Sequence, residues 1–171
     1  MTRLFSAIAA ICVAGSLGLA AQAGTSKVEM KNAEGKSVGT ATISAGKMGG
    51  ISIALDLMGL PPGDHAIHVH QVAKCEAPFT SAGGHFNPMM KQHGMQNPAG
   101  SHAGDMVNIT VAANGTVKTT VANANVVLGE GANSLFTNGG TALMIHADAD
   151  DMKTDPTGNA GGRIACGTIT K

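Results

Sequence analysis

The sequence has no tryptophan and no tyrosine, and only 13% of its 171 residues are charged. Globular domains average about 25% charged residues. Basic and acidic residues are equal in number, so the formal net charge is zero, which argues against bulk nucleic-acid binding because such binding needs a basic face. The missing aromatic side chains also remove most platforms on which bases stack. We therefore expect no nucleic-acid partner.

Only three cysteines are present, and the first lies in a segment typical of a secretory signal peptide. Arg3 supplies the positive start, Leu4 to Ala20 is uncharged and largely apolar, and Ala21-Gln22-Ala23 is typical of a cleavage site. A membrane anchor is the alternative, but the apolar stretch is barely long enough to span a bilayer. We expect residues 1–23 to be cleaved and residues 24–171 to form one periplasmic or otherwise exported domain, without membrane insertion.

Cleavage at this position would remove Cys12 and leave Cys75 and Cys166. Export leads to an oxidising compartment, where paired cysteines form disulfides. We therefore predict a disulfide between Cys75 and Cys166, with two buried free thiols as the alternative. Because Arg3 is the only charged residue removed, the net charge becomes about −1.

The rest of the chain alternates between short strand-like segments and turns, and glycine, with 24 residues, is about twice as frequent as usual. Apolar residues with a period of two predict strands over residues 28–30, 38–43, 51–57, 65–70, 107–111, 117–121, 142–146 and 164–169. Asn114-Gly115 is typical of the turn of a β-hairpin. No segment after residue 23 has a clear helical period. About eight short strands predict a single all-β antiparallel sandwich or barrel.

Two long segments, 71–104 and 147–162, lack this alternation. Loops of such length inside a compact domain are usually functional or disordered. The histidines border them, which favours function.

All seven histidines lie between residues 65 and 146. His68 and His70 alternate on one predicted strand, so their side chains point to the same face. Imidazole and carboxylate groups with this clustering predict a metal centre, since imidazole binds copper and zinc well. Three histidines and one aspartate would suit a closed zinc site, and the surplus histidines would suit copper. Spacing alone leaves open which ligand holds which metal. The candidate ligands are His68, His70, His85, His93, His102, Asp105 and His146.

Several ordered motifs carry a family resemblance. They are His68-Val69-His70, Ala82-Gly83-Gly84-His85-Phe86-Asn87-Pro88, His93-Gly94, His102-x-Gly104-Asp105, His146, and Gly161-Gly162-Arg163-x-Ala165-Cys166-Gly167. With these motifs the chain resembles the copper/zinc superoxide dismutases in their exported bacterial form, from about residue 27 to residue 170.

The resemblance implies an eight-stranded antiparallel Greek-key β-barrel with Ig-like architecture, an arrangement that this family is known to share. It also implies an oxidoreductase with one copper and one zinc per chain. Copper would cycle between two oxidation states and disproportionate superoxide to O2 and H2O2, while zinc would be structural because it has no redox chemistry. The implied copper ligands are His68, His70, His85 and His146. The implied zinc ligands are His85, His93, His102 and Asp105.

The resemblance assigns roles to further residues. His85 would bridge both metals and take up a proton during turnover. Arg163 would stand near the copper and guide the anionic substrate. Asp150 would link His68 to His93 and orient both rings. His65 matches no ligand position, so we expect it to be a structural hydrogen-bonding residue.

The sequence also departs from the family pattern. Ala66 stands where glycine is common, which would cause strain if that position needs a positive φ. Met89, Met90 and Met95 are unusual, and we weigh gap-filling in a loop against copper loading by soft thioethers. Lysines in the long loops would add a positive rim or simply be solvated: Lys74, Lys91 and Lys153.

Two other functions remain alternatives. A copper-storage protein would keep the ligands but would not need Arg163. A zinc hydrolase would need an open zinc position and a general base, for which only Glu76 lies near the ligands. The oligomeric state stays open, with a homodimer as one option.

Overall fold

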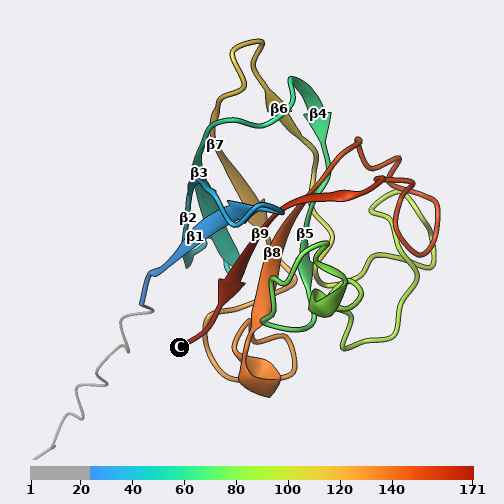
Figure 1. The fold of residues 1–171 in the computed structure, drawn as a ribbon. Coiled ribbons are helices and arrows are strands. Elements are labelled where there is room, and N and C mark those ends of the chain that lie inside the picture. Colours follow the sequence, from blue (N-terminus) through green and yellow to red (C-terminus); the bar gives the residue numbers. More distant parts are fainter. Residues whose placement is uncertain (1–23) are drawn as a thin grey trace, which may run out of the picture.

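The computed structural model describes residues 24–171, so the predicted signal peptide lies outside the described residues. These residues form β-strands and two single-turn 3-10 helices (Figure 1). The strands are β1 (Ser26–Asn32), β2 (Ser37–Ala45), β3 (Ile51–Leu57), β4 (Gly63–His65), β5 (Ile67–His70), β6 (Ile109–Val111), β7 (Val117–Asn123), β8 (Thr141–His146) and β9 (Arg163–Ile169). The short helices are η1 (Thr80–Ala82) and η2 (Thr137–Gly139).

The strands form a curled antiparallel barrel, as the sequence predicted. Seven of them are hydrogen-bonded in the order β5-β8-β9-β1-β2-β3-β7, and β4 pairs with β6. The chain passes from β4 through Ala66 directly into β5, so the two-stranded ladder continues the edge of the larger sheet. Strands β4 and β5 together correspond to the single strand predicted for residues 65–70.

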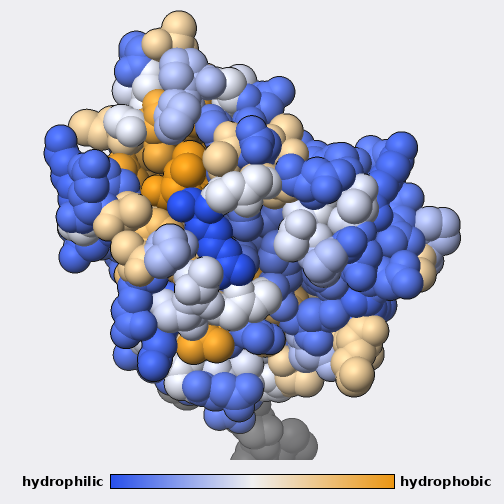
Figure 2. Space-filling view, turned by 45° about the vertical axis from the view of Figure 1, so that its right-hand side comes forward, coloured by the Kyte–Doolittle hydropathy of each residue, from blue (hydrophilic) through white to orange (hydrophobic). Residues whose placement is uncertain are grey.

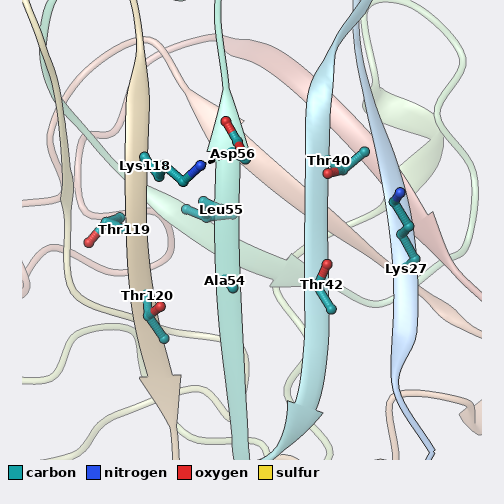
Figure 3. Close-up of a pocket in the computed structure, with 9 residues that line it drawn as sticks. All are labelled: Lys27, Thr40, Thr42, Ala54, Leu55, Asp56, Lys118, Thr119 and Thr120. Carbon is teal, nitrogen blue, oxygen red and sulfur yellow. Dashed lines mark hydrogen bonds and ion pairs between the residues drawn. The ribbon is translucent and has the colours of Figure 1, made fainter.

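Alternation in the strands separates the core from a polar outer face. On the inner face, Ile53 of β3 pairs with Ile43 of β2 and Val121 of β7, and all three are buried. One residue further along, Ala54 pairs with Thr42 and Thr120 on the outer face. Figure 3 shows this outer face on four neighbouring strands, where the labelled side chains other than the buried Leu55 are small or polar. Burial of the apolar side contributes on the order of 25 cal/mol per Å².

The predicted Asn114-Gly115 turn is present, but the prediction that its flanking strands pair as a hairpin is wrong. Gly115 N donates to Ala112 O at 2.8 Å, and Ala112 N donates to Thr116 O at 2.9 Å. Beyond these bonds the strands diverge, because β6 pairs with β4 and β7 pairs with β3. The turn signal is local, whereas pairing depends on which sheet buries each strand.

The two predicted long loops carry no strand, and only η1 interrupts the first. They lie side by side at one flank of the barrel (Figure 1), where hydrogen bonds join them. Ala66 is absent from the described residues with positive φ, so the expected strain does not arise there. Within residues 24–171 no helix has the length and apolarity needed to cross a membrane.

Candidate metal centre

Backbone hydrogen bonds fasten the first long loop along strand β5. Phe86 N donates to Val69 O at 2.8 Å, and Val69 N donates to Gly104 O at 2.9 Å. His85 and Asp105 are therefore held beside β5, the strand that carries His68 and His70: His85 forms a β-bridge with His70, and Asp105 forms one with His68. His146, at the end of β8, joins them because β8 pairs with β5.

One cluster of four buried histidines faces a common point. Their ring nitrogens lie within 4.8 Å of one another, and the members are His68, His70, His85 and His146. The Nε2 atoms of His70 and His146 are 3.3 Å apart. The Nδ1 of His68 and the Nε2 of His85 are buried with no hydrogen-bond partner. A buried polar atom without a partner costs about 1–3 kcal/mol, so a metal ion bound by these nitrogens would remove that penalty.

A second set of atoms meets on the other side of His85. The Asp105 Oδ1 lies 3.0 Å from the Nδ1 of His85 and 3.1 Å from the Nδ1 of His93. The Nδ1 of His102 lies 3.3 Å from the Nδ1 of His85 and 3.4 Å from the same oxygen. A tetrahedral zinc with bonds of about 2.0–2.1 Å separates its ligand atoms by roughly 3.3 Å. The four atoms therefore have the spacing of a zinc ligand set.

Distance alone also groups His68 with His85, His93 and Asp105. Hydrogen bonding argues against that grouping. The Nε2 of His68 is occupied by Asp150 Oδ2 at 2.8 Å, and its one free nitrogen, Nδ1, belongs to the first cluster, whereas the Nδ1 of His102 faces Asp105 directly. We therefore favour His102 as the fourth member of the second set.

Asp150 connects the two sets. Its Oδ2 accepts from the Nε2 of His68, and its Oδ1 lies 3.0 Å from the Nε2 of His93. Asn108 fixes the backbone of Asp150 through two bonds of 2.9 Å, one donated by its amide and one accepted by its carbonyl oxygen. Sequence reasoning missed Asn108, because nothing in its spacing indicates a contact with a residue 42 positions away.

Burial lowers the pKa of three of the histidines, whereas hydrogen bonds to carboxylates raise the pKa of a fourth. Burial lowers the pKa of His70 to about 2, of His85 to about 4 and of His146 to about 3. These rings are neutral at pH 7 and present free lone pairs, as metal ligands must. Burial would also lower the pKa of His93, but its hydrogen bonds to Asp105 and Asp150 outweigh burial and raise that pKa to about 9.

The two carboxylates remain ionised. Burial alone would raise the pKa of Asp105, yet hydrogen bonds from His102, His85 and His93 hold it well below its usual range. The pKa of Asp150 is likewise lowered by its contacts with His68 and His93, against the opposing effect of burial.

A cleft of about 480 Å³ leads from solvent to His85, and Arg163 forms part of its wall. Arg163 donates through Nη1 to Phe79 O at 2.5 Å and through Nη2 to Gly83 O at 2.6 Å. Partial burial lowers the pKa of Arg163 from a very high normal value. The guanidinium of Arg163 and the ring of His85 therefore line the same cleft.

Sequence reasoning missed Gln71, Pro156 and Thr157 in the cleft wall. The residues that line it in addition to His85, His102 and Arg163 are Gln71, Gly84, Asn87, Met90, Pro156 and Thr157. None of Lys74, Lys91 and Lys153 lines the cleft, and all three are exposed. Of the three unusual methionines only Met90 reaches it. The surrounding face, which carries the long loops, is mostly hydrophilic (Figure 2).

Cys75 and Cys166 form the predicted disulfide. Cys166 packs in a small buried cluster with Phe79, Ala82, Ala142 and Met144. His65 is the expected structural residue: its Nδ1 lies 2.9 Å from His146 O and its Nε2 lies 2.8 Å from Pro61 O. It therefore supports the backbone of a cluster histidine without facing the cleft.

A second hollow, of about 460 Å³, lies on the outer face of the sheet (Figure 3). Lys118 and Asp56 form an exposed ion pair of 3.0 Å at this place. No histidine lines the hollow, and exposed ion pairs contribute little. The histidine clusters and the cleft beside them remain the candidate functional site.

Comparison with known proteins agrees with this geometry. A family model described as copper/zinc superoxide dismutase (SODC) matches residues 37–169. The chain belongs to the copper/zinc superoxide dismutase family. It is 50% identical over 144 residues to the Cu-Zn superoxide dismutase 2 of Aquifex aeolicus strain VF5, covering 82% of this chain and 84% of that protein.

Two solved structures are also similar. The crystal structure of a SOD-like protein from Bacillus subtilis superposes with a TM-score of 0.81 at 38% identity, over 84% of this chain and 97% of that one. The Cu/Zn superoxide dismutase from Brucella abortus has a TM-score of 0.71 at 31% identity, over 85% and 99% of the two chains. This dismutase is thus an oxidoreductase of a family that binds copper and zinc, and its histidine clusters fit metal ions.

Proposed function

We propose that the protein disproportionates superoxide to O2 and H2O2 at a paired copper and zinc centre in which His85 bridges the metals. The proposed copper ligands are His68, His70, His85 and His146. The proposed zinc ligands are His85, His93, His102 and Asp105. The observation that carries the proposal is the placement of His85 between the two sets. Its Nδ1 belongs to the second set, beside Asp105. Its Nε2 belongs to the first cluster, where it is buried and has no hydrogen-bond partner.

Bound copper supplies the one-electron oxidation and reduction that superoxide dismutation requires. The chain's own residues bind the anion and handle the proton. Arg163 presents a positive charge to the cleft, and hydrogen bonds between charged partners are about twice as strong as neutral ones. Because the net charge of the mature chain is about −1, attraction of superoxide depends on local placement of charge and not on the total.

His85 is the proposed proton carrier. Its Nδ1 faces Asp105 and its Nε2 faces the other histidines beside the cleft, so the free side of the ring can take up a proton and donate it toward the reduced substrate. Asp150 keeps the rings of His68 and His93 in a fixed orientation throughout. The zinc-side residues would then hold the bridging ring while its other nitrogen changes protonation.

We further propose that residues 1–23 are a cleaved signal peptide and that residues 24–171 form an exported dismutase domain. The Cys75–Cys166 disulfide supports an oxidising compartment. The intact mass of the protein secreted by its own host, or by a bacterium expressing the full chain, tests this: cleavage after Ala23 is the expected result. Sedimentation of that material distinguishes the monomer from the homodimer that the sequence leaves open.

Metal analysis combined with an activity assay tests the centre itself. We expect one copper and one zinc per chain and rapid dismutation of superoxide by the purified mature protein. In His85→Ala we expect weakened retention of both metals, because both sets lose a member. One copper and one zinc with no activity would overturn the proposed reaction, and loss of only one metal in His85→Ala would overturn the bridge.

A further inference from the structure

The second long loop, 147–162, contacts the zinc-side residues through its own backbone and side chains. Gln96 N donates to Met152 O at 3.0 Å. Gly158 lies so close to Asp150 and His93 that a Cβ there would be 1.9 Å from Asp150 Oδ1 and 2.6 Å from His93 Nε2. The loop is thus held against the predicted zinc ligands and does not merely follow them in the sequence.

Asp155 is a second charged residue of this loop, after Asp150, that reaches the zinc-side histidines. Its Oδ1 accepts a hydrogen bond of 2.5 Å from the backbone N–H of His93. The same oxygen lies 3.8 Å from the Nε2 of His102. One carboxylate oxygen from the second loop therefore faces two histidines of the first.

The contact with His102 has a chemical consequence. The Nδ1 of His102 points to Asp105 and His85, so a neutral ring that binds metal through Nδ1 carries its proton on Nε2. A carboxylate beside that N–H fixes the tautomer and orientation of the ring and increases the basicity of the nitrogen that binds the metal. Asp150 has this relationship to His93 at 3.0 Å, whereas Asp155 Oδ1 lies 3.8 Å from His102 Nε2, beyond hydrogen-bond distance, and acts on that ring as a nearby negative charge.

We propose that Asp155 is a positioning residue that latches the second loop onto the zinc ligands, so that zinc affinity and the shape of the cleft wall are coupled. The inference rests on the proposed zinc site. Pro156 and Thr157, which follow Asp155 directly, line the cleft beside Arg163. A residue that ties the zinc ligands to this wall makes zinc binding and the order of the wall depend on each other, and such coupling is reciprocal. Zinc binding then orders the wall, and an ordered wall retains zinc.

Two variants separate the parts of the latch. Asp155→Ala removes both the acceptor for His93 N–H and the negative charge near His102. Asp155→Asn keeps a side-chain oxygen for His93 N–H and removes only the charge. Asp56→Asn is the matched control, because Asp56 is an exposed aspartate on the outer face of the sheet whose side chain pairs with Lys118.

The primary measurement is the zinc dissociation constant of the mature protein, obtained by competition with a chromophoric chelator. We expect Asp155→Ala to weaken zinc binding by about 10-fold, because the charged acceptor that fixes the backbone of His93 is lost, and Asp155→Asn to weaken it less. We also expect faster amide hydrogen exchange over residues 151–162 in zinc-loaded Asp155→Ala. The Asp56→Asn protein should match the wild type in both measurements.

If Asp155 has a purely structural role, its replacement would change stability and leave zinc affinity unchanged. It would lower the unfolding temperature of the metal-free and zinc-loaded proteins equally and leave zinc affinity unchanged, and that result would overturn the inference. Asp155→Asn keeps the test valid if Asp155→Ala does not fold. A wild-type chain that binds no zinc would overturn the proposed zinc site together with the latch, whereas tight zinc binding by wild type and both Asp155 variants would overturn the latch alone.

Discussion

Arg163 donates through Nη1 to the backbone carbonyl of Phe79, although 84 positions separate the two residues. Phe79 has a φ of 71°, which is uncommon for a bulky side chain. Its ring is buried in the cluster that contains Cys166. The Gly83 carbonyl, which receives the Nη2 of Arg163, also lies 2.9 Å from the Nδ1 of His70. The segment before His85 therefore sets the position of the cationic group relative to the histidines.

Arg163→Ala should slow dismutation while copper is retained. The guanidinium is the cationic group in the cleft wall, and its Nη1 and Nη2 donate to the carbonyls of Phe79 and Gly83, so it is not a candidate metal ligand. Hydrogen bonds to a charged group contribute about 1.5–3 kcal/mol, so we expect kcat/KM to fall by about 10- to 100-fold. Arg163→Lys should lie between, because lysine keeps the charge and loses the paired geometry.

The measurement is superoxide decay in pulse radiolysis, with metal content determined on the same samples. Retained copper with an unchanged rate would remove Arg163 from substrate guidance. Loss of copper in the lysine variant would instead show that Arg163 maintains the site itself.

The double substitution of Cys75→Ser and Cys166→Ser should destabilise the protein strongly. The disulfide joins residues 91 positions apart, and the chain-entropy model gives a loop of this size an upper figure of about 4–5 kcal/mol. Because Phe79 packs with Cys166, the position of its carbonyl should also loosen. We expect a lower free energy of unfolding in urea and a lower dismutation rate per bound copper. An unchanged urea midpoint would contradict the first expectation, and an unchanged rate would contradict the second.

Gly158→Ala should displace the second loop from the centre. The added Cβ would overlap Asp150 Oδ1, and the residue has a φ of +64°. Gly35→Ala is the control, since Gly35 has a φ of +77° and no atom within 4 Å of an added Cβ. Both variants carry the backbone penalty of a left-handed residue, so their difference isolates the clash. We expect weaker zinc retention in Gly158→Ala alone, and equal retention in the two variants would show that the loop adapts without cost.

The strands and much of the cluster follow from short-range patterns. Residues with a period of two bury their apolar side, so the alternation of Ile51 to Leu57 predicts the strand and its inner face together. His68 and His70 lie two residues apart on β5, and both rings reach the same cluster. The sequence also predicts the disulfide, because the expected removal of residues 1–23 leaves only two cysteines to pair.

Contacts made by backbone atoms and by distant loops do not follow from the sequence. Nothing in the spacing of Arg163 identifies the carbonyls of Phe79 and Gly83 as its partners. Nor does Asp155 differ in sequence from other loop aspartates until the second loop is placed over His93. The failed hairpin prediction at Asn114-Gly115 has the same cause, since turn chemistry is local and strand pairing is decided by the whole barrel.

The stability of the metal-free protein should depend on pH with a maximum near pH 7. The folded pKa values of His70, His85 and His146 are about 2, 4 and 3, against about 6.5 in the unfolded chain. Below pH 6.5 the unfolded chain therefore binds more protons than the folded one. Each of these histidines then lowers the free energy of unfolding by at most about 1.4 kcal/mol per pH unit as the pH falls.

His93 acts in the opposite direction. Its folded pKa of about 9 lies above the unfolded value, so its contribution is complete below pH 6.5 and is lost as the pH rises through 9. Asp105 and Asp150, with lowered pKa values, add to the acid-side loss below about pH 4. We expect the unfolding temperature, measured in excess chelator, to fall on both sides of neutrality and more steeply toward acid, where three histidines act together. A profile that is flat from pH 4 to 7 would show that these rings are not held neutral by burial in the folded protein.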